Sequence, residues 1–397
     1  MAKLSIRDID LKGKRVLVRV DYNVPLDDNG AITDETRIRE TLPTLDHLYS
    51  QGAKVILMAH LGRPKGKPDP KFTLRNVAKR LADVVCRPVA FVDDCVGEKV
   101  EKTVGAMQNG DTLVLENVRY YGEEEKNDPE FSKKLAKIAD VYVNDAFGAA
   151  HRAHASTEGV TRHVGKSAMG LLMEKELKFL GEELAKPAKP FVVILGGAKV
   201  SDKITVIDAL LDKCDVMLIG GAMAYTFKFA LDEEVGKSLC ERDKKELALS
   251  ALEKAKARGV KLLLPVDNLI TQEFKAGAKT QFTTPGQGIP ADWEGVDIGP
   301  ETVKLYSEEI AKAGTILWNG PMGVFEIPDF SKGTFEVARA IAANGKCTSI
   351  IGGGDSVKAV KKAKVADRMT FVSTGGGASL EFLEGRELPG VAALSDK

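Results

Sequence analysis

The sequence predicts an α/β protein with two Rossmann-like lobes, each a parallel sheet covered by helices, joined by a connecting helix. Length is the first reason: the chain has 397 residues, and a single hydrophobic core rarely grows past about 250 to 300. The second is that short apolar runs alternate with helix-length segments throughout, which is typical of βα units. The third is a helical pattern that ends in prolines near the middle of the chain.

The first half of the chain contains five short apolar runs that we interpret as strands. They are rich in valine, isoleucine and leucine, and continuous apolar runs are typical of parallel strands covered on both faces. We therefore expect residues 1–170 to form the first lobe. The runs are RVLVRV (15–20), KVILMA (54–59), VAFV (89–92), TLVLE (112–116) and VYVN (141–144).

A helical segment separates these runs from a second set. In SAMGLLMEKELKFLGEELAK, residues 167–186, the apolar positions follow helical spacing, and the pattern ends before Pro187 and Pro190. We interpret it as the connecting helix, with helix and hinge at residues 171–190. The second lobe is then expected at residues 191–382. Its apolar runs are FVVIL (191–195), VMLIG (216–220), KLLLPV (261–266), TILW (315–318), TSIIG (348–352) and MTFVS (369–373).

Two polar segments carry no predicted chemistry. TTPGQGIPADWEGVDIGP, residues 283–300, has glycine, proline and aspartate without periodicity, and we interpret it as a surface loop. The charged run YGEEEKNDPE, residues 121–130, is interpreted as a solvated approach to a helix.

The composition bounds the partners of the protein. Lysine and arginine number 57 and so do aspartate and glutamate, giving a formal net charge of +0, which argues against nucleic acid or an anionic membrane held by bulk charge. No apolar run is long enough to cross a membrane, and the first 20 residues lack the apolar region of a signal peptide, so we expect a cytoplasmic protein. The five cysteines form no CxxC pair and signal neither zinc nor a disulfide framework.

Polar side chains, arginines above all, follow the apolar runs of the first lobe. Ligands of open parallel sheets bind beyond the carboxyl ends of the strands, so these positions are candidates for a site. A guanidinium group donates two parallel hydrogen bonds to the oxygens of a carboxylate or phosphate. Several arginines at neighbouring strand ends therefore favour a small, multiply charged anion as the ligand. The residues are Asp21, Asn23, Arg37, His60, Arg63, Asn117, Arg119, Asp145, His151, Arg152 and His154.

The apolar runs of the second lobe are followed by glycines instead. The turns read GGAKVSDK, GGAMAYTF, WNGPMGVFE, GGGDS and STGGGAS. Glycines let the backbone approach a ligand, and helix N-termini that converge on one crevice suit the phosphates of a nucleotide. The P-loop pattern and a GxGxxG after a strand are both absent, so these turns alone do not identify a family.

Taken in order, the motifs resemble those of phosphoglycerate kinases over essentially the whole chain. The most specific are RVDYNVP, AHLGRP, LENVRYYGEEE, NDAFGAAHRAHAS, LGGAKVSDKI, WNGPMGVFE, IGGGDS and STGGGASLEFLEG. The resemblance implies reversible transfer of the acyl phosphate of 1,3-bisphosphoglycerate to ADP, giving 3-phosphoglycerate and ATP. It also implies a monomer and a tail, residues 383–397, that returns to the first lobe. TEGVTRHVGKSAMG matches the family more loosely, which leaves the end of the first lobe open.

The resemblance also implies a role for each site residue. Arg37 and Lys199 would flank the transferred phosphoryl group, to which Gly375, Gly376 and Gly377 would present a helix N-terminus. Glu326 would meet the ribose hydroxyls, and Asp355 would hold the Mg²⁺ of ADP or ATP. The 3-phosphoglycerate site would comprise Asp21, Asn23, Arg37, His60, Arg63, Arg119 and Arg152. The nucleotide site would comprise Lys203, Gly220, Gly221, Asn319, Glu326, Gly352, Gly353, Gly354, Asp355 and Ser356.

The residue types suit such a reaction. In the reverse direction the attacking group is the carboxylate of 3-phosphoglycerate, which is ionised well below pH 7, so no general base is required. Cations that position the phosphate oxygens and neutralise their charge are then sufficient. His60 is then a hydrogen-bond donor to the substrate. Two alternatives stay open: another two-lobed nucleotide enzyme such as a dehydrogenase, and a non-catalytic protein that closes on a phosphorylated acid. Lys199 and Asp355 argue against the second, since a binder needs neither.

Overall fold

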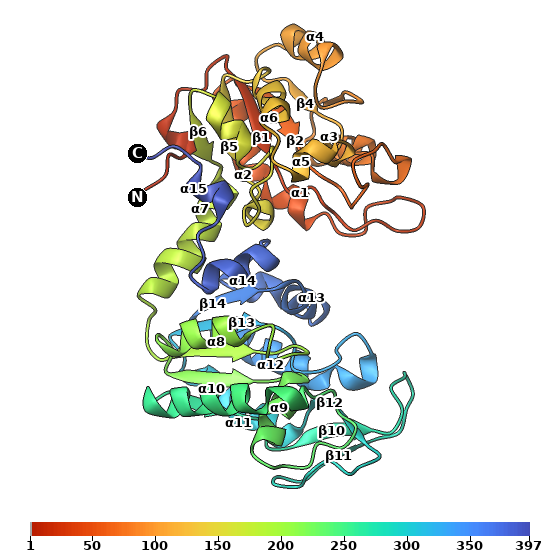
Figure 1. The fold of residues 1–397 in the computed structure, drawn as a ribbon, viewed down its shortest axis with the longest axis vertical. Coiled ribbons are helices and arrows are strands. Elements are labelled where there is room, and N and C mark those ends of the chain that lie inside the picture. The colour runs from red at the N-terminus through yellow and green to blue at the C-terminus, as the bar shows by residue number, and fades with distance from the viewer. Residues whose placement is uncertain (1) are drawn as a thin grey trace. The chain divides into compact units, whose positions relative to one another are not determined.

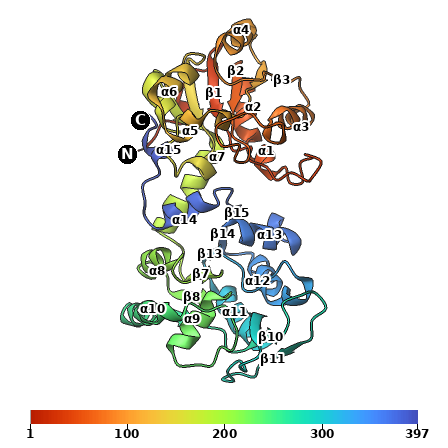
Figure 2. The same ribbon diagram turned by 45° about the vertical axis from the view of Figure 1, so that its right-hand side comes forward.

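The computed structural model describes residues 2–397, which form two compact units. The first unit comprises the chain up to Lys178 together with Glu387–Lys397, and the second comprises Phe179–Arg386. Each contains a six-stranded sheet in which every pairing is parallel. Figures 1 and 2 show helices on either side of each sheet. The predicted α/β class with two helix-covered parallel sheets is therefore confirmed.

The sheet of the first unit has the strand order β3-β4-β2-β1-β5-β6. The first strand of the chain therefore lies in the interior, between strands that come later, and polar residues after four neighbouring strands meet at one edge. The strands are β1 (Arg15–Arg19), β2 (Lys54–Met58), β3 (Ala90–Phe91), β4 (Thr112–Val114), β5 (Val141–Asn144) and β6 (Ser167–Met169).

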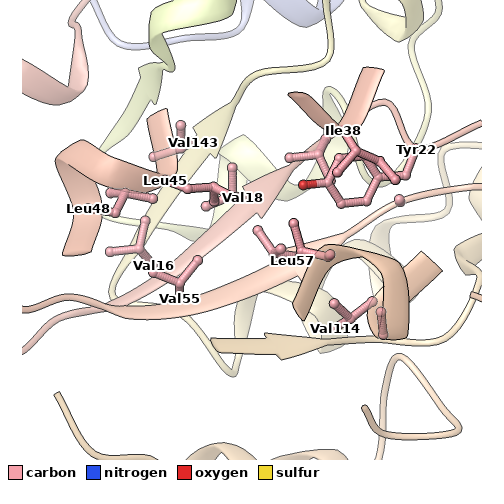
Figure 3. Close-up of a cluster of buried hydrophobic side chains, with 14 of the residues drawn as sticks. Val16, Val18, Tyr22, Ile38, Leu45, Leu48, Val55, Leu57, Val114 and Val143 are labelled. Carbon is pink, nitrogen blue, oxygen red and sulfur yellow. The ribbon is translucent and has the colours of Figure 1, made fainter. Parts of the chain in front are cut away.

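Both faces of this sheet carry a hydrophobic core, because alternate side chains of a strand point to opposite faces. Val16 and Val18 of β1 belong to one cluster, whereas Leu17 belongs to the other. Figure 3 shows Leu45 and Leu48 of helix α2 (Leu42–Ser50) beside these two valines. A strand that is buried on both sides reads as a continuous apolar run, which is why the sequence pattern located it.

Short helices connect these strands. Helix α6 (Pro129–Ala136) begins as its sequence requires, since the Asp128 carboxylate accepts a hydrogen bond from the Phe131 amide at 2.8 Å and Pro129 takes the first helical position. The others are α1 (Thr36–Glu40), α3 (Arg75–Val85), α4 (Glu98–Ala106), α5 (Gly122–Glu125), α7 (Leu171–Leu177), α15 (Pro389–Ala392) and the 3₁₀ turns η1 (Ile6–Asp8), η2 (Pro70–Phe72), η3 (Val118–Tyr120), η4 (Phe147–Ala149) and η5 (Gly159–His163).

The connecting helix begins at Leu171, the first residue of the expected helix and hinge at 171–190, but the residues before it in the helical pattern are not helical. Residues 167–169 form strand β6, and helix α7 starts at Leu171. It continues into a π-helical stretch, η6 (Lys178–Glu183), and helical geometry ends at residue 185. The boundary between the two compact units falls inside this helix. Strand β6 was not predicted, because a strand of three residues is too short to show a period.

The C-terminal tail packs on the first unit. Lys3 Nζ donates hydrogen bonds to the carbonyl oxygens of Ala392 and Leu394 at 2.8 and 2.9 Å, and it forms an ion pair with Asp396. The side chain of Leu394 is buried in the core cluster that contains Leu17. Residues 387–397 therefore belong structurally to the first unit.

The sheet of the second unit has the order β15-β14-β13-β7-β8-β9. Trp318 and Ile316 of β13 and Ile194 of β7 are fully buried in its main core. The strands are β7 (Phe191–Leu195), β8 (Val216–Ile219), β9 (Lys261–Leu263), β13 (Thr315–Asn319), β14 (Thr348–Gly352) and β15 (Phe371–Val372).

A second, antiparallel sheet adjoins this one within the same unit. Its strands are β10 (Asn268–Thr271), β11 (Thr280–Phe282) and β12 (Glu294–Ile298), in the order β11-β10-β12. The interpretation of residues 283–300 as a surface loop is therefore wrong for residues 294–298. Strand β12 carries Glu294, Gly295 and Asp297, so it lacks the apolar run that identifies the parallel strands.

Helices α11, α12 and α13 supply side chains to the main core of this unit, and α8 and α10 lie on the other side of its sheet (Figures 1 and 2). The helices are α8 (Ile204–Leu211), α9 (Met223–Ala230), α10 (Lys245–Ala257), α11 (Pro300–Lys312), α12 (Lys332–Ala343), α13 (Gly354–Lys362), α14 (Gly377–Leu383) and the 3₁₀ turns η7 (Arg242–Lys244), η8 (Pro328–Phe330) and η9 (Ala366–Arg368). Within residues 2–397, no helix has the length and apolarity needed to span a membrane.

Candidate active site

The first unit gathers basic side chains at the carboxyl ends of β1, β2, β4 and β5. Arg37 projects from α1, which follows the first strand, and its Nη1 donates to Oδ1 of Asp21 at 2.9 Å and to the carbonyl oxygen of Asn23 at 3.0 Å. The side chain of Arg37 is one-third exposed, whereas that of Asp21 is nearly buried. Asp21 therefore orients a guanidinium that keeps donors available to a ligand.

Asn23 and Arg119 fix the loop that follows β2. The amide of Gly62 donates to Oδ1 of Asn23 at 2.9 Å, and the carbonyl oxygen of Gly62 accepts from Nη1 of Arg119 at 3.0 Å. The Nε of Arg119 is buried without a hydrogen-bond acceptor. This Nε lies 3.5 Å from Oε1 of the half-exposed Glu125, an ion pair without a hydrogen bond, so a ligand oxygen can still accept from it and Arg119 favours an anion at this place.

Arg63 and Arg152 are exposed. Arg152 Nε lies 3.1 Å from Nε2 of His151, while the side chain of Arg63 has no hydrogen bond or ion pair to any of residues 2–397. Arg63 adjoins Gly62, so the chain itself places it next to the Arg119 contact. Both arginines are free to reorient toward a ligand.

The positive charges of this cluster act on one another. Burial lowers the pKa of Arg119. The nearby charges of Arg19 and Arg152 lower this pKa further, whereas those of Glu125 and Glu124 raise it. Burial also lowers the pKa of His60 well below its usual value, and Arg19, Arg119 and Arg37 lower it further. His60 is thus a neutral hydrogen-bonding group among fixed cations, as a site for a phosphorylated acid requires.

The second unit presents glycine turns at the carboxyl ends of β7, β8 and β13. Gly221 has φ +68°, and a Cβ added there would lie 2.5 Å from the backbone of Gly197. A Cβ at Gly196 would lie 1.9 Å from the carbonyl oxygen of Pro321. The three turns pack backbone against backbone, which only glycine permits.

These turns line a pocket of about 270 Å³ that lies wholly within the second unit. Leu239 and Phe274, more than half exposed, contribute apolar surface at the pocket, and Glu326 and Asp355 contribute carboxylates. An apolar slot with a few polar groups at its margin suits an aromatic base linked to a ribose and phosphates. The lining residues are Gly197, Ala198, Gly221, Ala222, Tyr225, Leu239, Phe274, Glu294, Gly295, Val296, Pro321, Met322, Gly323, Val324, Glu326 and Asp355.

Other residues of the predicted nucleotide site support these turns. Lys203 Nζ donates to the carbonyl oxygen and to Oδ1 of Asn319, at 3.0 and 2.6 Å. The fully buried Ser356 accepts from the Gly320 amide through Oγ at 2.5 Å. Gly220 packs against Met322, since a Cβ there would lie 2.4 Å from its sulfur. Gly352 and Gly353 pack against the Asn319 side chain, while Gly354 begins α13 and is exposed.

The predicted catalytic residues of the second unit lie at the turn after β7, which also carries Gly196 and Gly197, and at the turn before α14. Lys199 is exposed, and its charge acts on the Glu241 carboxylate. Gly376, with φ +54°, precedes the first residue of α14, and the amide of Gly375 donates to Oγ of Ser373 at 3.1 Å. Lys199 therefore has the freedom that a group contacting a transient charge needs.

Asp355 fits a magnesium ion that arrives with a nucleotide. Its carboxylate lines the pocket, is about half exposed, and pairs with Lys358 at 3.0 Å. Among the described residues, no group of three or more histidine, cysteine or acidic side chains could enclose a metal ion. Magnesium commonly takes one or two carboxylates and completes its shell with phosphates and water, so one Asp is a sufficient protein ligand.

Comparison with known proteins decides the family. A family model described as phosphoglycerate kinase matches residues 6–386. The chain belongs to the phosphoglycerate kinase family. It is 58% identical to a phosphoglycerate kinase of Koribacter versatilis and 59% identical to one of Acidobacterium capsulatum, each aligned over 100% of both chains. A structure of the phosphoglycerate kinase of Coxiella burnetii, 40% identical, matches with a TM-score of 0.88 over 98% of both chains.

Membership in the phosphoglycerate kinase family establishes the chemistry of the protein. It is a phosphotransferase whose acceptor is a carboxyl group, and the activity belongs to glycolysis. The fold is equally that of the family: a structure from Pyrococcus horikoshii, 33% identical, matches with a TM-score of 0.83 over 98% of both chains.

Sequence reasoning missed several residues near both ligand sites. Arg19 was interpreted only as part of a strand, yet it lies buried against His60. Glu124 was placed in a solvated charge run, and it is fully buried, which corrects that interpretation. Leu239 and Phe274 stand in no apolar run. A charged residue within an apolar strand was a usable signal for Arg19; the other three carried none.

Proposed function

We propose that the basic cluster of the first unit binds 3-phosphoglycerate or 1,3-bisphosphoglycerate and that the pocket of the second unit binds ADP or ATP. Arg119 carries the first assignment, because its Nε is paired only with the half-exposed Glu125 at 3.5 Å and has no hydrogen-bond acceptor, which a ligand oxygen would supply. The pocket supports the second through its apolar slot and its carboxylates. Asp21 and Asn23 orient the cluster, and Arg37, His60, Arg63, Arg119 and Arg152 contact the ligand.

In the reaction, a β-phosphate oxygen of ADP attacks the phosphorus of the acyl phosphate. The bond between that phosphorus and the acyl oxygen breaks, and the carboxylate of 3-phosphoglycerate leaves. Because this leaving group is a carboxylate, no proton has to be supplied or removed. We assign Arg37 and Lys199 to the equatorial oxygens of the transferred group, with the amides of Gly375 and Gly376 beside it. The transfer is in line and follows closure of the two lobes.

The nucleotide would be held in parts. Glu326 accepts from the ribose hydroxyls, Lys203 pairs with phosphate oxygens, and the glycine turns bring backbone amides close to them. Asp355 would hold Mg²⁺, which neutralises phosphate charge and orients the oxygens when bound. A monomer in the cytoplasm is part of this proposal. Its location in the cell needs a direct test, because a 56% identical phosphoglycerate kinase of Chlamydomonas reinhardtii is chloroplastic.

A coupled assay tests the proposal. Purified protein supplied with 1,3-bisphosphoglycerate, ADP and Mg²⁺ is expected to form ATP, and the reverse reaction is expected to consume ATP only when 3-phosphoglycerate is present. Arg119→Met should raise KM for 3-phosphoglycerate and leave KM for ATP unchanged. Tight binding of both ligands without ATP formation would instead indicate a non-catalytic binding protein, and loss of ATP affinity in Arg119→Met would overturn the assignment of the two ligands.

A further inference from the structure

His60 and Arg19 form a buried contact at the carboxyl ends of two neighbouring strands. His60 follows β2 and Arg19 ends β1, and the parallel register of the two strands brings their ends together. Nη2 of Arg19 lies 2.9 Å from Nδ1 of His60. Arg19 is 1% exposed and His60 is 7% exposed, so water does not compete for this contact.

Arg19 is held in one orientation by its other hydrogen bonds. Its Nε donates to Oγ of Ser156 at 2.8 Å, and its Nη1 donates to the carbonyl oxygen of Val20 at 2.6 Å. Ser156 in turn donates through Oγ and its amide to the two carboxylate oxygens of Glu124, at 2.6 and 2.9 Å. Glu124 is fully buried and balances the buried guanidinium charge.

The chemistry of the two groups leaves one arrangement of protons. A guanidinium has only donors and does not lose its proton in proteins. Nδ1 of His60 must therefore accept, which excludes a proton on that nitrogen. A doubly protonated ring is excluded on the same ground, since it also carries a proton on Nδ1. The pKa of His60 is lowered by every charged or titratable group that faces it: Arg19, Arg119, Arg37 and His154. The single ring proton then sits on Nε2.

We propose that Arg19 is a positioning residue that keeps His60 in the Nε2–H tautomer, so that His60 donates a hydrogen bond to the anionic substrate. The contact with the substrate rests on the proposed function, whereas the tautomer rests on the Arg19 contact alone. Within residues 2–397, Nε2 of His60 has no hydrogen-bond partner, so its proton is available to a ligand. With the proton on Nδ1, Nε2 would present a lone pair and repel a carboxylate or phosphate oxygen.

Nitrogen NMR of the full-length, ¹⁵N-histidine-labelled protein tests the tautomer without any ligand. Comparison with a His60→Gln sample identifies the His60 signals. We expect Nδ1 to show the shift of an unprotonated acceptor and Nε2 that of a protonated nitrogen, with no change between pH 8 and pH 6. A protonated Nδ1 at either pH overturns the proposal. This result does not depend on whether His60 binds the substrate, so it is separate from the proposed function.

A double-mutant cycle tests the consequence for binding. Glutamine at position 60 places an amide donor near the position of Nε2 and has no tautomers, so it should not need Arg19. Arg19→Met is always made together with Glu124→Gln, and arms that retain Arg19 also retain Glu124, because removal of either group alone would leave the other as a buried, unpaired charge. Arg19→Met is expected to raise KM for 3-phosphoglycerate by about tenfold to a hundredfold, as for a lost hydrogen bond to a charged group. In the His60→Gln background, the same change should raise it less than about threefold.

Equal increases of KM in the two backgrounds would show that Arg19 acts independently of the imidazole, and they would overturn the proposal. His60→Ala identifies a failure of the proposed function instead: a wild-type KM for 3-phosphoglycerate in that variant removes His60 from the substrate site. Circular dichroism and thermal unfolding of each variant verify that the fold persists.

Discussion

Nζ of Lys203 lies 2.6 Å from Oδ1 of Asn319, and this pair links the first turn of the second unit to the end of its central strand β13. Burial lowers the pKa of Lys203 to about 8, while Asp355 and Asp202 act in the opposite direction. The ammonium group therefore remains charged at pH 7 but is poorly solvated. An incompletely solvated cation beside glycine turns is arranged to gain from a phosphate.

Lys203→Met should weaken ADP binding by about tenfold to a hundredfold, because a charge-assisted hydrogen bond to phosphate is lost. Isothermal titration with ADP gives the affinity directly. Lys261→Met is the matched control, since the half-exposed Lys261 lies in the same unit, does not line the pocket, and pairs with Glu309, which keeps Lys312 as a second partner. An ADP affinity equal to that of the control would remove Lys203 from the nucleotide site.

Lys199→Ala and Arg37→Ala should each lower kcat by roughly 10² to 10⁴ and shift the KM values much less. Both side chains would contact charge that develops on the transferred group and is weaker in the bound substrates. Steady-state kinetics with both substrates varied would separate the two constants. Near-normal kcat in either variant would refute the assignment of that residue.

Asp355→Asn should raise the Mg²⁺ concentration needed for half-maximal activity, because a hard cation exchanges an anionic oxygen ligand for a neutral one. The variant also leaves Lys358 without its partner. Lys358→Gln is therefore the control, and it should leave the magnesium dependence as in the wild type. Identical magnesium titrations for Asp355→Asn and the wild type would exclude this carboxylate as a ligand.

Deletion of residues 388–397 should lower kcat more than it weakens ADP binding, since the nucleotide pocket lies wholly in the second unit. The deletion also removes the buried Leu394 side chain from the core of the first unit. Leu394→Ala alone should cost about 2 to 5 kcal/mol of unfolding free energy. Turnover and ADP calorimetry on the same truncated protein measure both effects, and full turnover without the tail would show that catalysis does not depend on its packing against the first unit.

The stability of the protein should fall between pH 6.5 and pH 4 partly because of His154. Burial, reinforced by Arg119 and Arg19, lowers the pKa of His154 from 6.5 to about 4. In this window the unfolded chain binds a proton at His154 that the folded protein excludes, so stability decreases as the pH falls. His154→Gln should flatten the decrease in urea unfolding experiments, and the exposed His163→Gln should not. Parallel curves for wild type and His154→Gln would refute the linkage.

Strand positions could be predicted from the sequence because parallel strands are buried on both faces. Val16, Leu17 and Val18 read as one apolar run for that reason. The same logic placed Asp21, His60 and Arg119 at strand ends, where a site of this fold must form. Strand β6 escaped prediction because it has only three residues, and β12 because its mixed polarity leaves no apolar run to detect.

The sequence by itself determined the fold class, the order of its elements and the residues available at the ends of the strands, because these depend on local periodicity and turn chemistry. Only the tertiary structure decided which of them meet. Arg19 and His60 are neighbours because β1 pairs with β2, and Glu124 is buried because Ser156 and Arg19 close over it. Such contacts join residues far apart in the chain, and their free energy comes from desolvation and charge pairing in a shared interior that no local pattern encodes.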